Sequence, residues 1–292
     1  MLAILFGLIG WGLSARPKHI PVPLPNGADE VIPLAGSIPK RPEGPNYTEA
    51  PASEIRAWIA ATPAFRSAIT TLLKKEFLVR NTSSNSSVRL MMALRELEKR
   101  LLAEARDESV PVADRMEICL ITYELGSRGT RGGAMFDGIV SAAVRINSLR
   151  NLSTCSSNAT SAQLKSAAVK LGQLIKRAPR LEDYRDGEAF FASTVPVKVK
   201  IESWIEDLKG DGLTKIFAPL IGAFEPKMTE INRIEQTTVR DLVVRSYTLD
   251  KRSAPTNWSD LIPTYLPAPL VDPVGKTNLS LIPGTAYKFS SE

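Results

Sequence analysis

Hydrophobic residues recur at helical spacing along most of the chain, and they are densest between positions 112 and 151. This stretch predicts two helices joined by a glycine-rich turn at positions 126–133. Apolar residues cover more than half of the first helix. In the second helix only Asp137, Arg145 and a few small polar residues interrupt two apolar stripes. Because a helix that is apolar almost all round is buried on several sides, we expect this hairpin to form the core.

Amphipathic patterns predict further helices around the hairpin. The clearest is the repeat Leu90, Leu94, Leu97 and Leu101, which has charged residues on its opposite face. Further helices are predicted from Ser53 to position 73 with a break or kink at Pro63, from Ser161 to 176, and over 228–249. Positions 195–208 are predicted as a helix, with a strand over 195–201 as the alternative, and 81–87 as a loop. The predicted fold class is all-α, mainly an antiparallel helical array.

Proline content and charge divide the chain into segments 1–15, 16–51, 52–250 and 251–292. The helical domain is the third of these. The segment 16–51 is rich in proline, which lacks an amide hydrogen, so we expect an extended linker without helix. The last segment is again punctuated by proline and is predicted to form a small irregular or β-ribbon unit.

Residues 1–15 contain no charged side chain. The run is shorter than the roughly 20 residues of a spanning helix and suits the apolar region of a signal peptide, with Ala15 as a cleavage point. Arg16 and Lys18 follow the run and no basic residue precedes it, which opposes simple export by the positive-inside rule. We expect a signal peptide or a membrane anchor such as a transmembrane helix, and the alternative is a buried N-terminal helix.

Composition limits the chemistry of the chain. Two cysteines, Cys119 and Cys155, and one histidine, His19, are too few for a zinc site, and no metal or cofactor is predicted. The cysteines either pair, if the chain is exported, or remain buried thiols. Lysine and arginine exceed aspartate and glutamate by 37 to 31, with the excess spread along the chain, so no nucleic-acid partner is expected.

Short motifs give only weak functional signals. The Gly-Lys-Thr sequence at 275–277 lacks the earlier glycine of a phosphate-binding loop, because Leu270 stands there, and it reads as a turn. The sequence at 126–129 matches the GXXG loop of KH domains. A KH fold needs strands beside this loop, but the residues on both sides of it are predicted to be helical. The carboxylate pairs 182/183, 186/188 and 206/207 are expected to be solvated. The weak candidates for anion contacts are Arg128, Arg131, Arg145 and Arg150.

Asparagine sequons are frequent in the chain. Seven of the ten asparagines begin an Asn-X-Ser/Thr sequence, at positions 46, 81, 85, 151, 158, 257 and 278. A secreted glycoprotein would explain this frequency, and so would chance in a surface rich in serine and threonine.

Three places carry a resemblance to a known family. They are NGA at 26–28, the helical run from LREL at 94–97 to EAF at 188–190, and the ending DLIPTYLP at 260–267 followed by DP at 272–273 and GK at 275–276. In these places the chain resembles an uncharacterised family of membrane-anchored or exported helical proteins of planctomycete bacteria. The resemblance implies a location, a helical architecture and a short β ribbon at the end, but no reaction.

The chain departs from that family at three points. Thr277 and Asn278 replace the Pro-Leu of the ending, and positions 287–291 replace its usual close. Family members often carry an acidic residue inside the second apolar helix, where this chain has Ser141, Ala142 and Ala143.

We therefore expect a non-enzymatic, membrane-anchored or exported helical protein that faces the periplasm, meets the membrane through its N-terminal segment and contacts an unknown protein partner or the envelope. One alternative is a hydrolase that works with carboxylates alone, which needs a cleft where two acidic side chains converge. Another is a binder of anionic lipid or nucleic acid through the arginine-rich turn.

Overall fold

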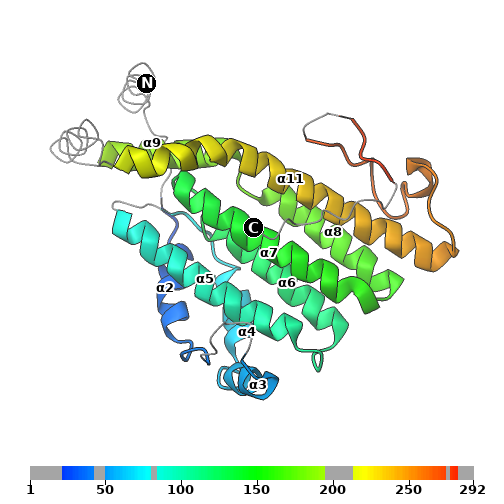
Figure 1. Cartoon of the computed structure of the whole chain (residues 1–292), viewed down its shortest axis with the longest axis horizontal. Helices are drawn as coiled ribbons and strands as arrows, with labels where there is room; N and C mark the ends of the chain where they lie inside the picture. The colour runs from blue at the N-terminus through cyan, green and yellow to red at the C-terminus, as the bar shows by residue number, and fades with distance from the viewer. Residues whose placement is uncertain (1–21, 43–49, 80–83, 195–212, 274–276, 282–292) are drawn as a thin grey trace.

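The computed structural model describes residues 22–42, 50–79, 84–194, 213–273 and 277–281, and this part of the chain is mostly helical. The prediction of an all-α fold is thereby confirmed for the described residues. The long helices lie alongside one another (Figure 1): α5 Ser84–Arg106, α6 Val112–Arg128, α7 Met135–Cys155, α8 Ser161–Arg177 and α11 Leu213–Lys251. The shorter helix α9, Leu181–Thr194, follows α8.

The predicted hairpin is the core of this array. Helix α7 contacts α5, α6, α9 and α11, and most residues of α6 from Met116 onward are buried. One boundary differs from the prediction, because Gly126 lies inside α6 rather than in the turn. A Cβ atom there would lie 2.7 Å from Val144 of α7, so this glycine lets the two helices approach closely. The turn itself depends on Gly132, whose φ of 79° favours glycine.

The helices before the hairpin follow the sequence pattern with shifted ends. Helices α3 Ala52–Ala60 and α4 Phe65–Leu72 are separated at Pro63, as predicted, although α3 begins after Pro51 and not after Ser53. Helix α5 already begins at Ser84, which corrects the loop predicted over 84–87. Helix α8 begins at Ser161 as predicted, and the preceding Thr160 caps it, since its hydroxyl accepts the amide of Gln163. The segment predicted as helix or strand over 195–208 lies outside the described residues.

Helix α2, Ala28–Gly36, corrects the expectation that the proline segment 16–51 contains no helix. Pro33 lies inside α2 and removes one helical hydrogen bond. Packing compensates for this loss, because α2 contacts α5 and the side chain of Val31 is completely buried.

Polar side chains fix α2, α3 and α4 to the helical array. The Asn26 carboxamide accepts the amide hydrogens of Ala28 and Leu78 and donates to the Leu78 carbonyl. The buried Arg100 of α5 donates to the Ile59 carbonyl and lies over the rings of Trp58 and Phe65, 5.6 and 5.1 Å from their centroids. Helices α2, α3 and α4 are therefore part of the packed body of the protein.

The C-terminal residues pack back against α8 and α11. The Tyr265 hydroxyl donates to Asp250 at 2.7 Å, and Lys165 lies over the Tyr265 ring. Residues 271 and 278 form an isolated antiparallel bridge. The described residues of this segment contain no strand that is longer than this bridge. The β ribbon therefore stays a prediction, and the motif at 275–276 and the close at 287–291 lie outside the described residues.

Within the described ranges, no helix is long and apolar enough to cross a membrane. This finding corrects the expectation of a transmembrane helix. Residues 1–15, from which that expectation arose, lie outside those ranges.

Candidate functional site

A buried polar stripe runs along α7. Asp137, Ser141 and Arg145 follow one another at intervals of four residues and therefore share one helix face. Each is at most 1% exposed. Polar groups at this depth need partners in the protein, because burial without a hydrogen bond costs several kcal/mol, about 2–7 in transfer experiments.

The inner end of the stripe is an ion pair between α7 and α11. The Arg145 guanidinium donates to the Glu235 carboxylate, and the Tyr123 hydroxyl of α6 donates to the same oxygen. Burial alone would lower the pKa of Arg145, but the Glu235 carboxylate raises it, so the guanidinium stays charged. Burial raises the pKa of Tyr123 well above its usual value. These three groups join α6, α7 and α11 at one point.

The middle of the stripe faces α9. The Tyr184 hydroxyl lies 3.0 Å from that of Thr130, and burial raises the pKa of Tyr184. The Tyr184 ring meets Phe224 edge to face, with centroids 5.6 Å apart. Both rings lie against Gly138 of α7, where a Cβ atom would clash with Phe224 at 2.5 Å and lie 3.1 Å from Tyr184. The glycine therefore allows α9 and α11 to cover this part of α7.

The outer end of the stripe is the N-terminus of α7, where two carboxylates converge. Asp137 accepts the amide of Ala134 at 2.8 Å, and Glu188 of α9 accepts the adjacent amide of Met135 at 3.2 Å. Carboxylates are favourable beside the free amides of a helix N-terminus. Glu188 was expected to be solvated, but it is only partly exposed, and burial raises its pKa.

The raised pKa of Glu188 predicts a pH dependence of stability. A group whose pKa is higher in the folded state stabilises that state below its unfolded pKa, and this contribution is lost as the pH rises through the folded pKa. We expect wild type to gain stability relative to Glu188→Gln as the pH falls from 7 toward the ordinary glutamate value of 4.5. Urea denaturation of both proteins at several pH values measures the difference, and a constant difference would contradict the prediction.

A second buried carboxyl lies against another part of α7. Glu98 of α5 accepts the Asn147 amide and an Arg95 guanidinium hydrogen, and burial raises its pKa. Asn147 lies twelve residues after Met135 on α7, a separation of about 18 Å at the rise of an α-helix. Glu98 and Glu188 therefore cannot act on one substrate atom.

The other predicted carboxylates do not add to this site. Glu182, Asp183 and Asp186 lie on α9, where Asp183 caps the helix start through the Arg180 amide, and positions 206 and 207 lie outside the described residues. Asp137 and Glu188 are thus the acids that converge, and both are used as acceptors for helix amides. This use favours a structural role.

The four candidate arginines do not form one anion site. Arg145 is buried in its ion pair, and Arg128 donates to the carbonyls of Leu73 and Lys75 and pairs with Glu124. Arg131 and Arg150 are exposed, but Arg150 lies fifteen residues beyond the start of α7, about 22 Å from the turn that holds Arg131.

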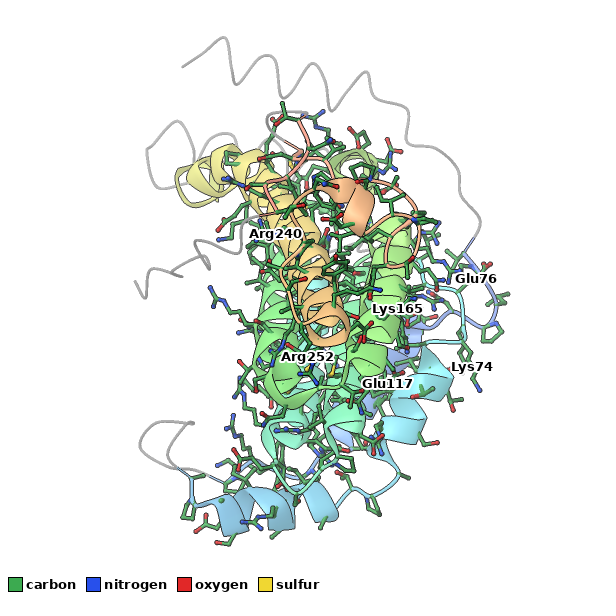
Figure 2. The ribbon with its side chains drawn as sticks, turned by 90° about the vertical axis from the view of Figure 1, so that its right-hand side faces the viewer. Lys74, Glu76, Glu117, Lys165, Arg240 and Arg252 are labelled. Atoms are coloured by element: carbon green, nitrogen blue, oxygen red, sulfur yellow. The ribbon has the colours of Figure 1, made fainter. Side chains whose placement is uncertain are left out.

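Surface charges of both signs are interspersed on the face shown in Figure 2. The labelled residues on this face include the basic Lys74, Lys165, Arg240 and Arg252 and the acidic Glu76 and Glu117. A mixed surface of this kind gives no single-sign field that would attract a polyanion.

An open hollow lies between α2 and α4. It has a volume of about 620 Å³. Its wall on the α4 side carries small side chains and Leu72, and its wall on the α2 side carries Pro33 and Leu34 together with the polar Glu30 and Ser37. The lining residues are Glu30, Pro33, Leu34, Ser37, Ala64, Ser67, Ala68, Thr71 and Leu72. The hollow is within the size range of small-ligand and peptide sites, and it is separate from the buried stripe.

Both cysteines are buried as free thiols, which is one of the two alternatives left open by the sequence. Among the described residues, no three His, Cys, Asp or Glu side chains gather as metal ligands do.

The sequence contains a pattern that indicates the buried polar stripe. The spacing 137, 141, 145 in an otherwise apolar helix marks one polar face. Nothing near Glu235 marked it as the partner of a residue ninety positions away. No sequence pattern indicates the hollow, because one of its walls is α2, and the prolines of segment 16–51 argue against a helix there.

Comparisons with protein-family models, with curated proteins and with solved structures each find no match for this chain. The resemblance to the planctomycete family therefore stays a prediction, and the described residues establish the helical fold alone.

Proposed function

We propose that the chain is a non-enzymatic helical binding protein whose hollow between α2 and α4 holds an apolar segment of a protein partner. The hollow is the observation that carries this proposal. It is open, and aliphatic and small side chains line it. The buried stripe, by contrast, is used to join α6, α7, α9 and α11.

The chemistry of the hollow favours a protein segment over an anionic ligand. Its lining residues offer the hydroxyls of Ser37, Ser67 and Thr71 and the Glu30 carboxylate, but no basic side chain. Glu30 is half-exposed and pairs with Lys75 beside the hollow. A phosphate or lipid headgroup would meet a carboxylate there. A segment with two or three aliphatic side chains and a flanking lysine or arginine matches the apolar side chains of the wall, and its basic group would share the Glu30 carboxylate with Lys75.

The small side chains of α4 supply the test. Ala68 lies in the wall of the hollow, and Ala68→Trp fills that space. Ala57 is an exposed alanine of α3 outside the hollow, so Ala57→Trp is the matched control. We expect a displayed peptide library to yield peptides with clustered aliphatic residues and a flanking basic residue when it is selected on wild type.

Binding of a selected peptide, followed by fluorescence anisotropy, should weaken roughly tenfold or more in Ala68→Trp and stay within about twofold in Ala57→Trp. The proposal is wrong if no such peptides are enriched, or if Ala68→Trp binds them as wild type does. The exported location predicted from residues 1–15 stays a separate prediction, which fractionation of a tagged protein tests.

A further inference from the structure

We propose that the peptide bond between Arg252 and Ser253 is a processing site for a serine protease specific for paired basic residues, and that the cleaved chain stays assembled. Hydrolysis adds one water molecule across this bond, which leaves a carboxylate on Arg252 and an amino group on Ser253. The proposal concerns the end of α11 and does not depend on the hollow.

Paired basic residues occur at 40–41, 74–75, 99–100, 176–177 and 251–252, all within the residues that the structure describes. A protease binds its substrate as an extended segment. A pair is therefore open to cleavage only where it is exposed and where neither helix nor side chains hold the backbone that follows it. These pairs share one sequence signal, and the fold makes their access unequal.

The last of these pairs meets both conditions. Lys251 is the final residue of α11, and Arg252 lies directly after it, at the right-hand edge of the body in Figure 1. Both side chains are exposed, and so are Ser253 and Ala254. Arg252 has a φ of 60°, which residues other than glycine rarely adopt. Unwinding this helix end relieves that strain, at the cost of hydrogen bonds such as the one from the Arg252 amide to the Thr248 carbonyl.

The pairs at 40–41, 74–75 and 99–100 are shielded for different reasons. Pro42 follows the first pair, and its ring makes the bond after Arg41 a poor substrate. The Lys75 carbonyl accepts the Arg128 guanidinium. Arg100 lies inside α5 and is 1% exposed. Cleavage at any of these places requires the protein to open first.

The pair Lys176–Arg177 is the matched comparison. It has the same two residues as 251–252, it also ends a helix, and both side chains are exposed. The two residues that follow are Ala178 and Pro179, and both are buried. The backbone on the far side of that bond is therefore closed to a protease, whereas Ser253 and Ala254 are open.

The segment beyond Arg252 is held to the body by contacts that the cut does not touch. Leu261 and Tyr265 are 0% and 5% exposed, and the Tyr265 hydroxyl donates to Asp250 of α11 at 2.7 Å. Arg240 of α11 donates to the Ser280 carbonyl at 3.2 Å. Cleavage therefore yields two pieces, 1–252 and 253–292, that remain bound to each other.

The experiment incubates the folded full-length chain with a purified kexin-type protease and follows it by denaturing gel and intact mass. Wild type should be cut first between Arg252 and Ser253, into pieces whose masses add up to the chain plus one water. Both pieces should elute together on size-exclusion chromatography without denaturant and apart in urea. Synthetic peptides that cover 176–177 and 251–252 should both be cut, because the fold and not the sequence protects the first pair.

Two double variants identify the bond. Lys251→Gln with Arg252→Gln should slow the loss of intact chain roughly tenfold or more, whereas Lys176→Gln with Arg177→Gln should leave the rate within about twofold of wild type. The proposal is overturned if folded wild type is cut first at another pair, or if it resists a protease that cuts the peptides. It is equally overturned if the piece 253–292 elutes apart from the rest without denaturant.

Discussion

Glu235→Leu is expected to lower the free energy of unfolding by roughly 3–5 kcal/mol, because it leaves a charged guanidinium buried without its partner. Arg145 and Glu235 are each 1% exposed, and Tyr123 donates to the same carboxylate. Removal of the Glu235 carboxylate therefore leaves both the Arg145 guanidinium and the Tyr123 hydroxyl without this acceptor. A loss of this size is a large part of the 5–15 kcal/mol that typically stabilises a folded protein.

Urea denaturation of wild type, the two single variants and the double variant measures the free energy of unfolding around a double-mutant cycle. The double variant with Arg145→Leu and Glu235→Leu removes both charges and should lose less stability than Glu235→Leu alone. The matched control is Glu117→Gln, which breaks the half-exposed pair with Lys170 and should cost less than about 1 kcal/mol. If Glu235→Leu costs no more than this control, the buried pair does not hold α7 to α11.

Gly187→Ala is expected to destabilise the docking of α9 by about 3 kcal/mol. A Cβ atom at Gly187 would lie 1.9 Å from the carbonyl oxygen of Gly133 and 2.7 Å from that of Gly132. Both contacts are with backbone atoms, so no flexible side chain can move aside. Helix α9 must shift, and Glu188, the next residue, then loses its bond to the Met135 amide.

Gly172→Ala is the control for this substitution. Gly172 is inside α8, and a Cβ atom there meets nothing within 4 Å. The same chemical change should therefore stabilise the protein by about 0.5–1 kcal/mol, because alanine favours the helix. Thermal unfolding of both variants should show shifts of opposite sign. Equal shifts would mean that the close contact of α9 with the turn at 132–133 is not maintained.

The helical core could be predicted from the sequence because its signal is local. Two nearly continuous apolar helices joined by glycines allow few arrangements other than a buried hairpin, and α6 and α7 form one. Helix ends were less predictable. Gly126 was assigned to the turn because glycine usually breaks helices, whereas here it permits the contact of α6 with Val144.

The remaining features depend on contacts between distant positions. Pro33 argues against a helix by local chemistry, and only the burial of Val31 against the body makes α2 stable. The pairing of Arg145 with Glu235 is likewise invisible until α11 lies beside α7. The hollow depends on both α2 and α4, so no single sequence pattern marks it.

Native-state hydrogen exchange measured by mass spectrometry tests the central claim most directly, which is that the α6–α7 hairpin is the buried core of the protein. Amides in the middle of α6 and α7 should exchange more slowly than all others and at the rate of global unfolding, while α3 and α4 exchange faster. Exchange of α6 and α7 as fast as that of α3 and α4 would contradict the account.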